Sequence, residues 1–165
     1  MSLHIRPVRD DDIEDLARLS LLAWRPIFSS FEQILGPEIY PIIYPDWLKT
    51  QREAVETVCK DGEETLVWVG TVDGIVVGFV AYKLHKDETG EVYLLAVHPE
   101  CQNDGIGAEL NNFTEKDARK RYENGRGRDR RRSISRPGQK IVRKSRVYGA
   151  TVGALLQKVV GSARN

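Results

Sequence analysis

The sequence predicts an α+β domain in which helices flank a mostly antiparallel sheet. Residues 65–83 hold two alternating apolar runs joined by Asp73-Gly74, a hairpin signal. Another β-like run, Glu91 to Val97, leads through a glycine-containing loop into a helical pattern from about Gly105 to Arg121. A strand and helical patterns precede the hairpin, which completes the order expected of this fold class.

The first third of the chain predicts one strand followed by helices. His4 to Val8 alternates as a short strand does, and residues 10–12 supply acidic groups that favour a helix start. Apolar residues then recur at helical spacing up to about Trp24. Because proline disrupts a helix interior, Pro26 is expected to end this helix.

A second short helix is expected from about Phe28 to Gly36, followed by a loop rich in proline and tyrosine. Asp46 is expected to cap a helix from Trp47 to Cys59. Two interpretations of the aromatic residues are open, namely packing of the helical layer and shaping of a pocket. These residues are Trp24, Phe28, Phe31, Tyr40, Tyr44 and Trp47.

The composition indicates one domain, with 165 residues of which 41% are hydrophobic and 30% charged. No apolar stretch approaches the roughly 20 residues that cross a bilayer, and Met1 to Val8 lacks the features of a signal peptide, so a cytoplasmic location is expected. Cys59 and Cys101 form no C-x-x-C pair, so neither a metal site nor a disulfide framework is expected.

The charge is divided unevenly along the chain. Residues 1–113 hold 9 Lys and Arg against 20 Asp and Glu, a net charge of −11, whereas residues 114–165 hold 16 against 4, a net charge of +12. A shift of this size indicates a boundary or a basic tail.

The stretch most informative about function is the loop that follows the strand from Glu91 to Val97. Gly105 and Gly107 allow backbone N–H groups to approach an anion, and the following helix adds the positive end of its dipole. This pattern predicts a phosphate site. It is neither a P-loop nor a dinucleotide fingerprint, because the Lys-Ser/Thr pair and the G-x-G-x-x-G spacing are absent.

The whole segment, Val97-x-Pro99-x-x-Gln102-x-x-Gly105-x-Gly107, resembles the acetyl-CoA-binding signature of the GNAT superfamily of N-acetyltransferases. The resemblance covers residues 3 to about 113 and implies that the loop amides bind the coenzyme A pyrophosphate while main-chain groups of the strand pair with pantetheine. The residues expected at the coenzyme are Leu95, Ala96, Val97, Gln102, Asn103, Asp104, Gly105, Ile106, Gly107 and Ala108.

The resemblance also implies a catalytic residue, because some GNAT members place a general-base glutamate at the start of this strand, where Glu91 lies. A carboxylate can take the proton that an ammonium must lose before it attacks. A solvated strand-end acid is the alternative interpretation of Glu91. His98, beside a proline at the strand end, is read as a loop residue rather than a base.

The family pattern stops after the glycine loop and its helix. A complete GNAT domain continues with an apolar strand, a helix that often carries an acid-donating tyrosine, and two closing strands, whereas residues 114–165 carry an Arg/Gly run. We therefore divide the chain into a GNAT core at 3–113 and, at 114–165, a helix end with a basic, poorly ordered tail, so that the C-terminal half of the fold is incomplete.

A one-base frameshift near Phe113 or Thr114 is the leading explanation for this departure. With permitted codon choices, residues 121–161 can be reread as an apolar strand, a Tyr-Glu-Lys-x-Gly-Tyr motif found in many GNAT proteins and a closing strand, followed directly by a stop. Arginine codons of the tail then become codons for small and apolar residues.

The predicted function is acetyl transfer from acetyl-CoA to a primary amine of a small molecule or peptide, impaired by the missing elements. Two alternatives stay open: a non-catalytic acyl-CoA-binding module, and a nucleic-acid-binding protein that uses the Arg/Gly run. Few aromatic residues accompany that run, which makes nucleic acid the less favoured partner. No membrane partner is expected, and a homodimer is left open.

Overall fold

The computed structural model describes residues 2–62, 65–85 and 90–126. Within them, four strands form one antiparallel sheet in the order β1-β2-β3-β4. The strands are β1 (His4–Pro7), β2 (Thr65–Val72), β3 (Ile75–Leu84) and β4 (Gly90–Val97). The helices are η1 (Asp10–Asp12), α1 (Ile13–Ile43), α2 (Trp47–Lys60), η2 (Pro99–Cys101) and α3 (Ile106–Arg126). The predicted α+β fold is confirmed.

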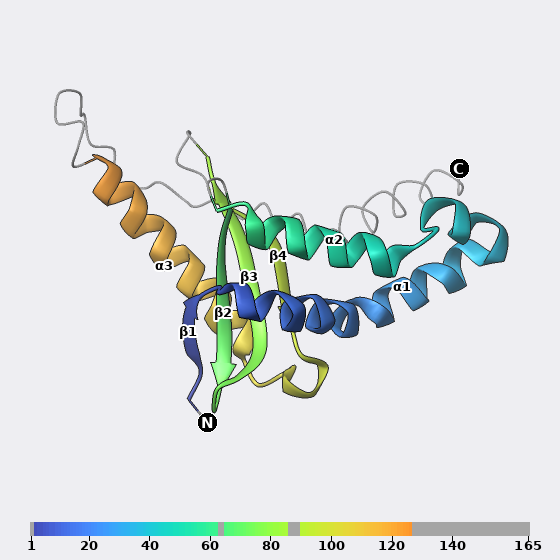
Figure 1. Ribbon diagram of the computed structural model, residues 1–165, viewed down its shortest axis with the longest axis horizontal. Helices are drawn as coiled ribbons and strands as arrows, with labels where there is room; N and C mark the ends of the chain where they lie inside the picture. The colour runs from blue at the N-terminus through green and yellow to red at the C-terminus, as the bar shows by residue number, and fades with distance from the viewer. Residues whose placement is uncertain (1, 63–64, 86–89, 127–165) are drawn as a thin grey trace, which may run out of the picture.

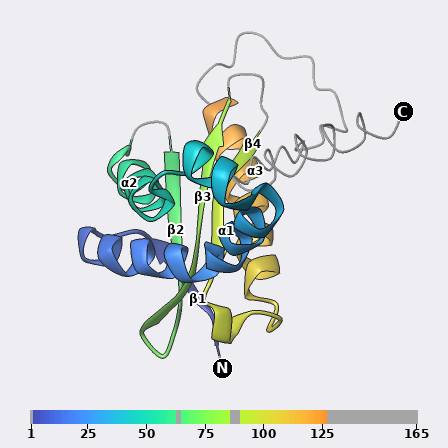
Figure 2. The ribbon, with the colours of Figure 1, turned by 90° about the vertical axis from the view of Figure 1, so that its right-hand side faces the viewer.

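The sheet has a helical layer on each face, with α1 and α2 on one side and α3 on the other (Figures 1 and 2). Alternation along the strands separates two apolar clusters. Toward α1 and α2 lie the strand residues Val67, Val69, Phe79, Ala81, Leu94 and Ala96. Toward α3 lie Val77 and Val80, which pack with Ile106 and Leu110.

The prediction that α1 ends at Pro26 is wrong. The helix continues through Pro26, and its backbone leaves helical geometry only at Gly36, with φ 74° and ψ 171°. Trp24 and Phe31, on either side of the proline, are both buried, so packing of the two flanking turns offsets the lost backbone hydrogen bond.

The expected loop after Gly36 is also wrong, because residues 37–43 are helical. The break at Gly36 makes Pro37 the first residue of a new helical segment, where its missing N–H costs nothing. The next helix starts as predicted, since the Asp46 carboxylate accepts a hydrogen bond from the Lys49 amide at 3.1 Å.

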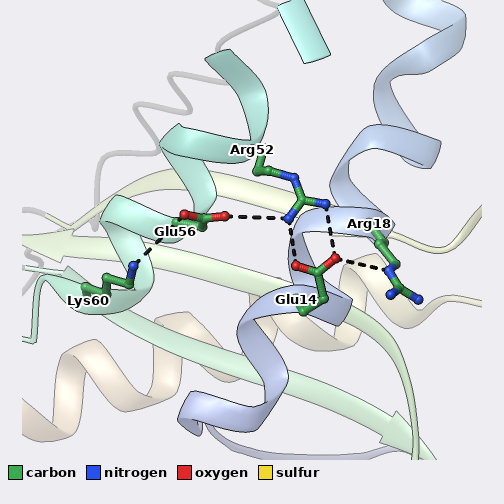
Figure 3. Close-up of polar contacts among 5 residues, drawn as sticks. All are labelled: Glu14, Arg18, Arg52, Glu56 and Lys60. Carbon is green, nitrogen blue, oxygen red and sulfur yellow. Dashed lines mark hydrogen bonds and ion pairs between the residues drawn. The ribbon is translucent and has the colours of Figure 1, made fainter. Parts of the chain in front are cut away.

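The two helices α1 and α2 are joined by side-chain contacts of different burial. Buried Gln51 donates to the Ser20 hydroxyl at 2.6 Å. Nearer the surface, Arg52 binds both carboxylate oxygens of Glu14, at 2.6 and 3.1 Å (Figure 3). These contacts orient the helical pair as one layer over the sheet.

No helix in the described ranges is both long and apolar enough to cross a bilayer. Two sequence-based expectations, the Arg/Gly run and the frameshifted reading of 121–161, lie almost entirely beyond Arg126 and so fall outside the described residues.

Candidate functional site

A cavity of about 450 Å³ lies where β4 ends and α3 begins. It is lined by Leu95, Val97, Cys101, Gln102, Asn103, Gly105, Gly107 and Ala108. The cavity therefore joins an edge of the sheet to the N-terminus of a long helix.

The edge of β4 offers backbone groups to this cavity. The His98 amide donates to the Val77 carbonyl at 2.8 Å, and the Ala96 carbonyl faces Gly78, so both residues belong to the ladder with β3. Because the direction of backbone groups alternates in an antiparallel strand, those of Leu95 and Val97 point to the open edge. In the described sheet no strand lies beyond β4 on that side.

The loop between β4 and α3 is held by unusual backbone angles. Asn103 has φ 71° and Gly105 has φ 81°, the left-handed region that glycine adopts without strain. The first helical hydrogen bond runs from the Glu109 amide to the Gly105 carbonyl at 3.0 Å. The amides of Ile106, Gly107 and Ala108 therefore precede the ladder of α3, at the positive end of its dipole.

Most of the residues expected at the coenzyme line this cavity, and three do not. Ala96 is buried in the cluster beneath α1 and α2, because its side chain points to the opposite face from Leu95. Ile106 packs into the cluster beneath α3. Asp104 is exposed in the loop. None of these three residues lines the cavity.

Gln102 and His98 have local structural roles. The side-chain nitrogen Nε2 of Gln102 donates to the Val97 carbonyl at 3.1 Å, which ties the loop to the end of β4. The His98 ring nitrogen Nδ1 accepts from the Glu100 amide at 3.3 Å and caps η2, as its interpretation as a loop residue requires. Cys101, which sequence reasoning set aside, lines the cavity, and only the folded loop shows this.

Glu91 lies near the opposite end of β4 from the glycine loop. Its carboxylate contacts His85 Nε2 at 3.1 Å, and its side chain is only 17% exposed. A β-bulge at Tyr93 re-phases the strand, so Glu91 is on the α1/α2 side of the sheet. Sequence reasoning missed His85, because its place two residues beyond Lys83, the partner of Glu91, becomes visible only once the register of β3 and β4 is known.

Helix α3 contacts the sheet along its described length. Leu110, Thr114 and Ala118 are buried at helical spacing. The Tyr82 hydroxyl donates to Asp117, and burial, followed by this contact, raises the pKa of Tyr82. One turn further on, Arg121 donates to Asp117 at 2.6 Å. The sheet-facing pattern of α3 thus extends beyond residue 113 to Ala118, and exposed Arg121 supports it through Asp117.

No cluster of His, Cys, Asp and Glu suited to a metal ion occurs among the residues that the structure describes. The cavity instead presents backbone amides, one open strand edge and a helix N-terminus, which suits an extended ligand with an anionic end.

Three solved structures share the fold. A PaiA N-acetyltransferase from Thermoplasma acidophilum, in complex with coenzyme A, matches at TM-score 0.58 and 21% identity over 73% of this chain and 74% of that one. A GNAT acetyltransferase from Brucella melitensis, in complex with acetyl-CoA, matches at TM-score 0.52 and 21% identity over 72% of this chain and 69% of that one. The ribosomal-protein-S18-alanine N-acetyltransferase from Escherichia coli matches at TM-score 0.51 and 15% identity over 73% of this chain and 61% of that one.

No curated protein matched the sequence. The model of the acetyltransferase (GNAT) family matches residues 24–128, a span that holds the sheet from β2 to β4, the glycine loop and the whole of α3. The match covers more than half of the chain and includes the cavity built above. The chain therefore belongs to the GNAT family of acetyltransferases.

Proposed function

We propose that this protein transfers the acetyl group of acetyl-CoA to a primary amine. The observation that carries the proposal is the cavity bounded by the open edge of β4 and the N-terminus of α3. The presence of coenzyme A or acetyl-CoA in the structures from Thermoplasma acidophilum and Brucella melitensis supports this choice of co-substrate.

In the proposed complex the pyrophosphate lies against the amides of residues 106–108. Three N–H groups without helical partners and the dipole of a 21-residue helix converge there. The pantetheine arm lies along β4, where the outward backbone groups of Leu95 and the N–H of Val97 continue a strand ladder, while the Val97 carbonyl accepts from Gln102. At about 3.4 Å per residue, the path from Val97 to Glu91 is about 20 Å, which is enough for an extended chain.

The reaction needs no covalent intermediate on the protein. The nitrogen of the amine attacks the thioester carbonyl carbon, a C–N bond forms, and the C–S bond breaks as its electron pair moves to sulfur. A backbone N–H of the β4 edge would polarise the carbonyl oxygen as negative charge develops there.

We propose Glu91 as the group that takes the proton from the ammonium form of the acceptor. Its carboxylate is largely shielded from solvent but lies within a strand that borders the coenzyme path. His85 Nε2, at 3.1 Å, holds one carboxylate oxygen, which leaves the other oxygen for the acceptor. A hydrogen bond of this kind fixes the rotamer that proton transfer requires.

We further propose that the frame of this chain changes after Arg121 rather than near residue 113. Thr114 and Ala118 are buried, Asp117 accepts from Tyr82 of β3, and exposed Arg121 binds Asp117 from one turn further along, as residues selected for this fold do. A change of frame at this position is compatible with the rereading of residues 121–161.

The proposal is tested by measuring thiol release from acetyl-CoA with a panel of primary amines, and coenzyme A affinity by calorimetry. Both the chain as written and a version with the reread C-terminal part are expressed. We expect saturable coenzyme A binding in both and faster thiol release in the reread version. If neither version binds coenzyme A, the acetyl-transfer proposal fails; if the chain as written turns over as fast, the frameshift proposal fails.

A further inference from the structure

A second pocket, of about 370 Å³, lies at the junction of α1 and α2. Tyr40, Tyr44 and Trp47 give it aromatic walls, and Pro41 restricts the backbone beneath them. None of its lining residues lines the cavity at the β4 edge. The two sites are therefore separate in both sequence and structure.

The aromatic walls are held in place by other rings. Trp47 stacks on Phe28 with ring centroids 4.3 Å apart and an interplanar angle of 14°. Tyr44 stacks on Phe31 at 5.8 Å and 11°, and Phe31 is itself buried in the helical layer. The pocket is thus a preformed hollow rather than a gap between mobile side chains, which lowers the entropy cost of binding a ligand.

The charge that lines the pocket is negative. Glu32 and Asp46 are its ionisable carboxyl groups, and no lysine or arginine is among the residues that line it. Asp46 uses one carboxylate oxygen to cap α2, whereas Glu32 has no hydrogen bond or ion pair to any described residue. Burial and then the charge of Glu32 raise the pKa of Tyr40, so the carboxylate and the phenol are neighbours.

One polar atom of the aromatic walls has no hydrogen-bond partner among the described residues. The Tyr44 hydroxyl is buried and makes no hydrogen bond to any residue that the structure describes. A buried hydroxyl without a partner costs free energy. A ligand with a positive charge would be attracted to the ring faces and the carboxylates of the pocket together.

We propose that this pocket binds an organic cation, with the ammonium group between the faces of Tyr40, Tyr44 and Trp47 and the Glu32 carboxylate. The rings and the Glu32 carboxylate act together. The rings replace water around the ammonium group, and the carboxylate neutralises its charge. A neutral ligand of the same shape gains only the apolar contact, and an anion is repelled.

The test uses choline and its neutral carbon isostere, 3,3-dimethylbutan-1-ol, as probes. The protein is labelled with ¹⁵N, and the indole signal that disappears in Trp47→Phe is followed in a titration. We expect choline to shift this signal saturably and the isostere to bind about tenfold or more weakly, which corresponds to about 1.4 kcal/mol. Equal affinity for choline and the isostere overturns the proposal.

Matched carboxylate variants locate the site. Glu32→Gln should weaken choline binding about fivefold to tenfold, as expected when one charge-assisted contact is lost, while Glu38→Gln, an exposed acid on the same helix outside the pocket, should leave it unchanged. Both variants should melt like the parent, because neither side chain has a structural contact among the described residues. If both substitutions, or neither, weaken choline binding, the assignment of this pocket is wrong. Coenzyme A affinity, measured on the same samples, tests the proposed acetyl transfer separately.

Discussion

The cavity at the β4 edge and the aromatic pocket at the α1–α2 junction differ in which part of the chain forms the binding surface. In the first, backbone amides and carbonyls border the cavity that we propose for coenzyme A, and glycine spacing decides how closely the backbone approaches it. In the second, rings and a carboxylate do so, and the backbone only holds them. A backbone site leaves a mark in the sequence because few residue types permit its geometry, whereas a side-chain site uses residues that are equally common in a core.

The largest expected effect is on the coenzyme A affinity of the cavity at the β4 edge, the backbone site. Gly105→Leu places a side chain in the cavity at a position with φ 81°, so coenzyme A affinity should fall at least about a hundredfold, as expected when one or two charge-assisted amide contacts are lost. Calorimetry measures the loss. The matched control is Gly74→Leu, which imposes the same backbone strain at φ 82° in the β2–β3 turn but should leave the affinity intact.

If Gly74→Leu weakens coenzyme A binding as much as Gly105→Leu does, the effect comes from general destabilisation. The distinction between a backbone site and a side-chain site would then lose its main support.

The next largest effect is expected on kcat, from the Glu91 side chain on the strand that borders the cavity. Glu91→Gln should lower kcat about a hundredfold or more near neutral pH, because a general base contributes about 10²- to 10⁴-fold. The deficit should shrink as pH rises, since the acceptor amine then loses its proton to water. Coenzyme A affinity should change little, and the exposed Glu53→Gln serves as the control. A pH–rate profile that keeps its shape in Glu91→Gln removes this carboxylate from the mechanism.

A third prediction tests how α1 is anchored to the sheet. Asp12 accepts from Arg6 at 2.6 and 2.8 Å and from the Arg9 amide at 2.8 Å, and these contacts, above all the one with Arg6, lower the pKa of the buried carboxyl. A lowered folded-state pKa gives stability that is present above the unfolded value of about 3.9 and is lost as pH falls further.

Asp12→Asn should therefore lower the free energy of unfolding by about 2 kcal/mol at pH 7, and the difference from the parent should fade below about pH 4. Urea unfolding at several pH values measures it, and the exposed neighbour Asp11→Asn is the control. A difference that persists unchanged at pH 3 contradicts the ion pair as its cause.

The smallest effect is expected at the surface of the helical pair. Arg52 holds Glu14, whose pKa it lowers from 4.5 to about 2, but both side chains are exposed (Figure 3). Arg52→Ala should reduce the melting temperature less than Gln51→Ala, which removes the buried contact with Ser20. The contribution of Glu14 exists above pH 4.5, disappears toward pH 2, and is screened by salt. A loss of melting temperature in Arg52→Ala that is unchanged in 1 M salt, or that exceeds the loss in Gln51→Ala, would contradict this prediction.

Sequence reasoning located the strands within one or two residues and placed the glycine loop correctly before α3. It failed at Pro26, because the cost of proline is local while the packing of Trp24 and Phe31 that offsets it is not. The same limit applies to His85. Its contact with Glu91 depends on the register between β3 and β4, which the hairpin signal alone does not specify.

The sequence by itself determined the fold class, the family signature and the position of the glycine loop, because glycine spacing and alternating apolar residues express local backbone requirements. Only the tertiary structure decided which backbone groups of β4 face outward, which carboxylates are neutralised by neighbours, and that Tyr40, Tyr44 and Trp47 enclose a hollow instead of filling a core. The first outcome depends on the pairing of β4 with β3, and the last on how α1 bends at Gly36 and returns as α2. The free energy of that arrangement is shared among contacts distant in sequence, so no local pattern records it.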